Sequence, residues 1–94
     1  MPHEVPIDGV LDLHCFSPRD IASVVEEYIW TASATNLPVL RIIHGRGIGV
    51  QRRTVQMVLR RHPAVMSFWD APESHLGATV VQLLTGTRNR LPEP

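Results

Sequence analysis

The chain has 94 residues, 44% of them hydrophobic, and its nine acidic and nine basic residues balance, which suits one domain over residues 1–94 and leaves no room for a second. No apolar run approaches the roughly 20 residues of a membrane span and no signal peptide opens the chain, so we expect a cytoplasmic monomer without membrane contact. The single cysteine, Cys15, excludes an internal disulfide and a cysteine-based metal framework.

The hydrophobic pattern predicts four strands and two helices in the order βαβαββ. In chain order, the expected elements are a strand over 10–14, a helix over 18–34, a strand over 39–44, a helix over 50–61, a strand over 64–71 and a strand over 78–84. Ser17 and Pro18 are expected to begin the first helix, and Asn36 to follow its end in the left-handed conformation. The folded core is expected within about 7–84, with a flexible lead-in and tail.

This order predicts a two-layer α/β domain in which the first two strands are parallel, because a helix joins them by a right-handed crossover. Parallel neighbours end at the same edge of a sheet, where α/β proteins bind their ligands. His14 closes the first strand and His44 closes the second. We therefore expect the two imidazoles in one site, within about 10 Å of each other.

Asp12, His14 and His44 are the candidate catalytic residues. Asp12 and His14 lie two residues apart on the predicted strand, so they share a face. A carboxylate beside an imidazole can fix its tautomer and raise its basicity, as a general base requires. The alternative interpretation is a purely structural hydrogen bond. A zinc site built from these three residues would lack the closely spaced paired ligands that such sites use, so no metal ligand is assigned.

The segment RIIHGRGIGVQRR, residues 41–53, is predicted to hold a phosphate. Glycine lets the backbone approach a ligand closely and exposes N–H groups, and a helix start adds further N–H groups and a favourable dipole. Arginines supply full charges and bidentate contacts. The candidate phosphate-binding residues are Gly45, Arg46, Gly47, Gly49, Arg52, Arg53 and Arg60. The spacing matches neither the dinucleotide fingerprint nor the phosphate loop.

Charge is distributed unevenly along the chain. Residues 1–27 hold six acidic residues and one arginine, whereas residues 28–69 hold six arginines and no acidic residue. These arginines either contact nucleic acid or pair with the acidic first third, and both alternatives stay open. Of the other polar side chains, Cys15 is interpreted as a half-buried filler, and the remaining histidines as solvent-exposed or helix-end residues. These histidines are His3, His62 and His75.

The segments LDLH (11–14), IIHGRGIG (42–49) and GATVVQL (77–83) resemble the three signature segments of the Smr domain, the small MutS-related domain. The resemblance runs from about residue 7 to 84, and the chain resembles the type that occurs alone in bacteria rather than at the C-terminus of MutS2-type proteins. It implies a four-stranded mixed sheet of order 1-2-4-3 with two helices, and nicking or cleavage of DNA or RNA. The family motifs Leu-Asp-x-His and His-Gly-x-Gly fall on Leu11, Asp12 and His14, and on His44, Gly45 and Gly47.

The sequence departs from the family pattern at three places. Cys15 stands where glycine is frequent, Arg46 where lysine is common, and SHL (74–76) replaces glycines before the last motif. Not every Smr domain cleaves, and metal dependence varies, so a divalent cation such as Mg²⁺ or Mn²⁺ stays open as a cofactor. We expect a nicking endonuclease or endoribonuclease that binds DNA or RNA. The alternatives are a non-catalytic DNA- or ribosome-binding module and a protein-interaction domain.

Overall fold

The computed structural model describes residues 8–45 and 49–84 of the chain. Its main elements are β1 (Val10–Asp12), α1 (Ile21–Ala34), β2 (Val39–Ile43), α2 (Val50–Arg61), β3 (Val65–Asp70) and β4 (Ala78–Leu83). Three short 3-10 turns, η1 (Leu13–Cys15), η2 (Pro18–Asp20) and η3 (Pro72–Ser74), lie between them. The predicted order βαβαββ is confirmed. No helix in this described part is long and apolar enough to cross a membrane.

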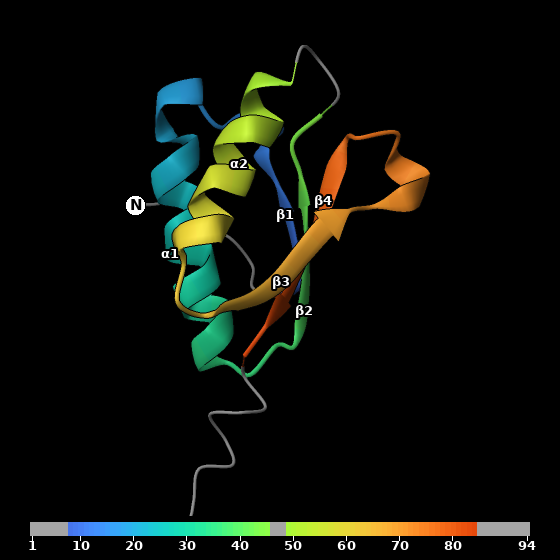
Figure 1. Ribbon diagram of the computed structural model, residues 1–94. Coiled ribbons are helices and arrows are strands. Elements are labelled where there is room, and N and C mark those ends of the chain that lie inside the picture. Colours follow the sequence, from blue (N-terminus) through green and yellow to red (C-terminus); the bar gives the residue numbers. More distant parts are fainter. Residues whose placement is uncertain (1–7, 46–48, 85–94) are drawn as a thin grey trace, which may run out of the picture.

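The four strands form one sheet in the order β1-β2-β4-β3. β1 and β2 are parallel, and β4 runs antiparallel to both of its neighbours, so the mixed sheet has the expected topology. Figure 1 shows α1 and α2 side by side on the same face of the sheet, which gives two layers. Because β3 is parallel to β1 and β2, three strand ends and the start of β4 share one edge. We call this the site edge.

The strand register confirms that the segments carrying the two candidate histidines meet at the site edge. Asp12 of β1 lies opposite Ile43 of β2, and Ile43 lies opposite Ala78 of β4. His14 follows two residues after Asp12, and His44 follows directly after Ile43. The parallel crossover therefore brings segments thirty residues apart in sequence to neighbouring positions.

The hydrophobic core lies between the helices and the face of the sheet that they cover. Alternate residues of β2 and β4, including Ile42 and Val81, point into it. The helices contribute residues spaced three and four apart, as the sequence predicts for amphipathic helices. These are Ile21, Val25, Tyr28, Ile29 and Ala32 of α1, and Val55 and Leu59 of α2. This packing fixes the start of α2 over the site edge.

Two element ends differ from the predictions by more than one residue, and the ends of β2, β3 and β4 that differ do so by a single residue. The first strand ends at Asp12 rather than His14, because the Asp12 carboxylate accepts the backbone N–H of His14 at 3.1 Å and caps η1. The first α-helix begins at Ile21 rather than at residue 18, because Pro18 accepts a 3-10 hydrogen bond from Ile21 and Ser17 makes no side-chain cap. Asn36 does adopt the expected left-handed conformation, with φ of 64°.

One side chain differs from the predicted burial, and one residue expected at a helix end is buried there. Cys15 is exposed rather than half-buried. His62 ends α2 as expected, but it is buried: its Nδ1 accepts the N–H of Ala64 at 3.1 Å, so Nε2 donates to the Glu26 carbonyl at 3.3 Å. The Trp30 ring lies 4.5 Å from the His62 ring, so His62 ties α1 to the end of α2. His3 and the expected flexible segments 1–7 and 85–94 lie outside the described residues.

Candidate functional site

The turn that follows β1 holds Asp12 against His14. Asp12 Oδ1 accepts the backbone N–H of His14 at 3.1 Å and lies 2.9 Å from His14 Nδ1. The two side chains were expected on one face of a strand, and the structure joins them through the 3-10 turn instead. They remain 48% and 76% exposed, respectively. The pair is therefore preorganised and open to a substrate.

Asp12 fixes the tautomer of His14. The hydrogen bond from the His14 side chain lowers the pKa of Asp12 below its ordinary value of 3.8, so this group is a carboxylate at neutral pH. A carboxylate only accepts hydrogen bonds, so Nδ1 carries the proton and Nε2 is the basic nitrogen of the neutral ring. The Cys15 Sγ lies 3.4 Å from Nε2. A thiol is a weak donor that water or a substrate can displace.

His44 has a different environment from His14. It is only 6% exposed, with Nε2 at 2.9 Å from the Thr79 hydroxyl oxygen and Nδ1 at 3.1 Å from the Gly45 carbonyl oxygen. Because the carbonyl can only accept, Nδ1–H donates to it and Nε2 accepts from Thr79. Burial lowers the pKa of His44, so the ring is neutral at pH 7. Both ring nitrogens are thus used within the fold.

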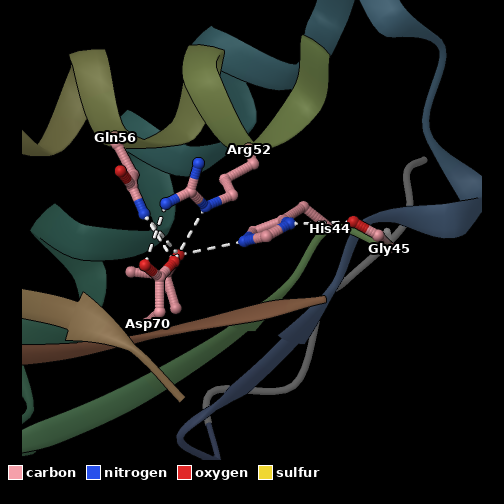
Figure 2. A network of polar contacts seen from close by, with 6 residues as sticks. His44, Gly45, Arg52, Gln56 and Asp70 are labelled. Carbon is pink, nitrogen blue, oxygen red and sulfur yellow. Dashed lines mark hydrogen bonds and ion pairs between the residues drawn. The ribbon is translucent and has the colours of Figure 1, made fainter. Parts of the chain in front are cut away.

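Side chains of α2 extend this contact into a network across the sheet. The Gln56 amide donates to the Thr79 hydroxyl and to Asp70 Oδ1, each at 3.2 Å. Arg52 donates from Nε and Nη2 to the two oxygens of Asp70, both at 2.8 Å. Figure 2 shows Arg52 and Gln56 pointing from α2 toward Asp70, while His44 reaches the same place from the end of β2, where it contacts Thr79. We call His44, Arg52, Gln56, Asp70 and Thr79 the polar network.

The polar network places Arg52 differently from the other arginines of α2. Its guanidinium lowers the pKa of Asp70, and the carboxylate in turn raises the pKa of Arg52, so both stay charged as a bidentate pair. Arg53 and Arg60 are exposed instead. The ion pairs of Arg41 and Arg52 within 8–45 and 49–84 lead to Glu73 and Asp70, in the last third of the chain. The alternative that the arginines pair with the acidic first third finds no support there.

The glycines beside His44 shape the backbone. Gly45 and Gly49 have φ of 83° and 86°, in the left-handed region that favours glycine. The N–H of Gly45 was a candidate phosphate donor, but it donates to the Gly77 carbonyl at 2.9 Å, an acceptor shared with the N–H of His44 at 3.0 Å. Gly77 therefore anchors the start of the loop. Arg46 and Gly47 lie outside the described residues.

Gly77 is a site residue that the residue-by-residue interpretation missed. Its only signal in the sequence is its place at the head of the third Smr-like segment. Gly49 is the N-cap of α2, and within residues 8–45 and 49–84 no side chain caps this helix. The start of α2 therefore directs its dipole and first N–H groups toward the site edge, the arrangement that favours a phosphate.

No group of three or more His, Cys, Asp or Glu side chains within residues 8–45 and 49–84 could hold a metal ion. Asp12 and His14 are close to each other, but His44 turns its nitrogens toward Thr79 and Gly45. The zinc alternative built from Asp12, His14 and His44 is therefore not supported by the described geometry.

Comparisons with known proteins agree with this arrangement. The family model described as the Smr domain matches residues 11–84. Endonuclease MutS2 of Caldicellulosiruptor bescii is 39% identical over 82 residues, which are 85% of this chain and 10% of that protein. The chain thus spans about a tenth of the length of the curated relatives that it matches.

Two solved structures share the fold. The Smr domain of Thermus thermophilus MutS2 is 36% identical, with a TM-score of 0.74 over 79% of this chain and 95% of that one. YdaL, a stand-alone small MutS-related protein from Escherichia coli, is 26% identical, with a TM-score of 0.67 over 83% of this chain and 66% of that one. The topology and the family resemblance predicted from the sequence are therefore both confirmed.

Proposed function

Because this chain belongs to the Smr domain family, we propose that it binds nucleic acid and hydrolyses phosphodiesters, as a nicking endonuclease or endoribonuclease. The observation that carries the proposal is the exposed Asp12–His14 pair at the same sheet edge as the start of α2, whose N-cap Gly49 offers no side chain. Similar MutS2 proteins bear the name endonuclease, which supports the same activity. A base and a phosphate-binding helix end are the two parts that such a reaction needs.

The start of α2 is the proposed holder of the scissile phosphate. Its free N–H groups and dipole favour an anion, and Arg53 adds a full charge in the first turn. Arg46, Gly47 and Gly49 belong to the same proposed phosphate site. Arg60 follows Arg53 by seven residues, or about two turns of α2, and its proposed contact is a neighbouring phosphate. Arg52 takes a positioning role instead, because Asp70 already compensates its charge.

His14 is the proposed general base. Its Nε2 accepts a proton from a water molecule as the water oxygen bonds to phosphorus, and Asp12 stabilises the imidazolium that forms. The bond from phosphorus to the leaving sugar oxygen breaks, and this oxygen takes a proton from solvent. Backbone N–H groups at the start of α2 stabilise the charge that develops on the phosphoryl oxygens.

His44 is a proposed positioning residue of the same site. Its buried ring joins Thr79 on β4 to the carbonyl of Gly45, so it orients the first peptide of the glycine loop. The polar network links this ring to α2 through Gln56. A substitution of His44 should therefore affect phosphate binding and cleavage together, because it acts through the loop rather than on the reacting atoms.

Supercoiled plasmid and structured RNA, each incubated with the protein in EDTA, Mg²⁺ or Mn²⁺, test this function. We expect nicked circles or RNA fragments in at least one condition, together with binding in a gel-shift titration. Binding without cleavage in all conditions would instead indicate the non-catalytic DNA- or ribosome-binding module. No binding to either polymer would overturn the nucleic-acid role and favour the protein-interaction domain.

A further inference from the structure

The charged side chains are divided between the two helices. The sequence of α2, VQRRTVQMVLRR, carries four arginines and no acidic residue, whereas α1 carries Glu26 and Glu27 and no basic residue. Both helices run in the same direction on the same face of the sheet (Figure 1). The helical layer therefore has a positive half over α2 and a negative half over α1.

The exposed residues of α2 form a stripe along its outer face. Val55 and Leu59 are buried against the core, and the exposed side chains follow one another at spacings of three and four. They are Val50, Arg53, Met57, Arg60 and Arg61. Arg52 is not part of this stripe, because it turns toward β3 to pair with Asp70 (Figure 2).

Three arginines of the stripe keep their charge uncompensated. No ion pair to a carboxylate involves Arg53, Arg60 or Arg61 within residues 8–45 and 49–84. The Arg60 guanidinium carbon lies 5.9 Å from the centre of the Phe68 ring on β3, at cation–π distance. This contact holds Arg60 on the β3 side of α2, away from the acidic residues of α1.

We propose that the arginines of the stripe, Arg53, Arg60 and Arg61, form a track for a sugar-phosphate backbone that leads from the site edge along α2. This proposal rests on the proposed function and adds the path that the bound nucleic-acid strand takes. From Arg53 to Arg61 the helix rises about 12 Å, which is about three to four nucleotide steps of 3.4 Å along a duplex. The helix is therefore long enough for each arginine to reach a different phosphate.

The chemistry of the stripe favours contact with phosphates rather than with bases. Proteins that hold unstacked bases use aromatic side chains as platforms, and the stripe offers only arginine, methionine and valine. The exposed tryptophans lie elsewhere, Trp30 on α1 and Trp69 on β3. Arginines along an exposed helix suit charge contact that is independent of base sequence. Glu26 and Glu27 repel phosphates from the α1 side.

The salt dependence of affinity for a duplex of about 20 base pairs, as DNA and as RNA, tests the track. Each phosphate contact on B-DNA contributes a slope of about −0.9 to log K against log salt concentration. Arg61→Gln should flatten the slope on DNA by about 0.9, and Arg60→Gln with Arg61→Gln by about 1.8. Arg61→Lys should retain the wild-type slope, because the charge remains.

Arg41→Gln is the matched control. It removes one positive charge from β2, where Arg41 pairs with Glu73, and should leave the slope unchanged. Equal slopes for wild type, Arg61→Gln and the double variant would overturn the track, together with the Arg60 contact, and would leave the proposed cleavage site at Asp12, His14 and the start of α2 intact. Failure of the wild type to bind either duplex would instead overturn the proposed function. Urea unfolding checks that each variant is folded.

Discussion

Two histidines at the ends of neighbouring strands differ in chemistry because they differ in burial. His14 is exposed, and Asp12 holds its proton on Nδ1, so Nε2 is the basic nitrogen and contacts only the weakly bound, displaceable Cys15 thiol among the described residues. His44 is buried and uses both ring nitrogens inside the fold. The same side-chain type thus gives a candidate base at one position and a positioning residue at the other.

The buried His44 should make stability depend on pH. Burial holds the pKa of His44 in the folded protein below its ordinary value of 6.5, so the unfolded chain binds more protons below that pH. The stabilisation from the neutral ring is complete above pH 6.5 and is lost as pH falls through the folded pKa. Urea unfolding should therefore give a lower free energy of unfolding at about pH 5 than at about pH 7.5.

Two variants identify the source of this pH dependence. The His44→Gln side chain cannot titrate, so this variant should be less stable than wild type at about pH 7.5. Its free energy of unfolding should also change less between about pH 7.5 and about pH 5 than that of wild type. His75→Asn removes an exposed imidazole at φ of 52°, a conformation that asparagine tolerates, and should keep the wild-type difference. If His44→Gln lost as much stability between about pH 7.5 and about pH 5 as wild type, another group would be the cause of the pH dependence.

At the scale of the element, α2 places two adjacent arginines in different roles. Arg52 faces β3 and pairs with Asp70, whereas Arg53 faces solvent at the start of the helix. A helix turns by about 100° per residue, so neighbouring positions face different directions. One helix thereby supplies both an internal clamp and an external binding surface.

The adjacent variants Arg52→Gln and Arg53→Gln should separate folding from binding. Arg53→Gln should flatten the slope of log K against log salt concentration by about 0.9 with little change in unfolding. Arg52→Gln should leave that slope unchanged but unfold at lower urea concentration, because Asp70 loses its bidentate partner. Salt titrations and urea unfolding measure the two effects. The reverse pattern would place Arg52 on the phosphate.

At the scale of the whole molecule, the core fixes α2 over the sheet and so fixes the site edge. Leu59 is buried in the core, whereas Met57, two residues earlier, is 42% exposed. Leu59→Ala should lower the free energy of unfolding by about 2 to 5 kcal/mol, because it removes transfer energy and leaves a cavity. Met57→Ala should change it by less than about 0.5 kcal/mol. Similar losses in urea unfolding would contradict this packing.

The sequence was sufficient to predict the parts of the fold that depend on local pattern. The hydrophobic pattern placed α2 correctly over 50–61, and the helix-joined strands predicted the parallel pair. The end of β1 was missed because the Asp12 side chain competes for the backbone of His14. Such a cap is a local contact that alternation does not reveal.

The parts of the site that depend on distant contacts could not be predicted. Nothing near Arg52 in the chain indicates that Asp70, eighteen residues later, neutralises it. The carbonyl of Gly77 takes the N–H of Gly45 only because β4 pairs with β2. The residue types of the site were therefore predictable, but which of their groups remain free for a ligand depends on the sheet order.

Asp12 should support His14 without being essential. Asp12→Asn removes the charge behind the imidazole and weakens the preference for the tautomer with the proton on Nδ1, while the backbone turn can persist. Cleavage should fall by less than in a variant that lacks the imidazole, with affinity unchanged. Single-turnover cleavage of one substrate by both variants gives the comparison. A larger loss in Asp12→Asn than in His14→Ala would place the essential group on the carboxylate.

One comparison tests catalysis by His14 most directly. The cleavage rate and the affinity of wild type and His14→Ala are measured in parallel on one labelled substrate. The variant keeps the start of α2 and its arginines, so affinity should stay within a few-fold. The cleavage rate should fall by about 10² to 10⁴, the usual contribution of a general base. Cleavage by His14→Ala at the wild-type rate would contradict the assignment.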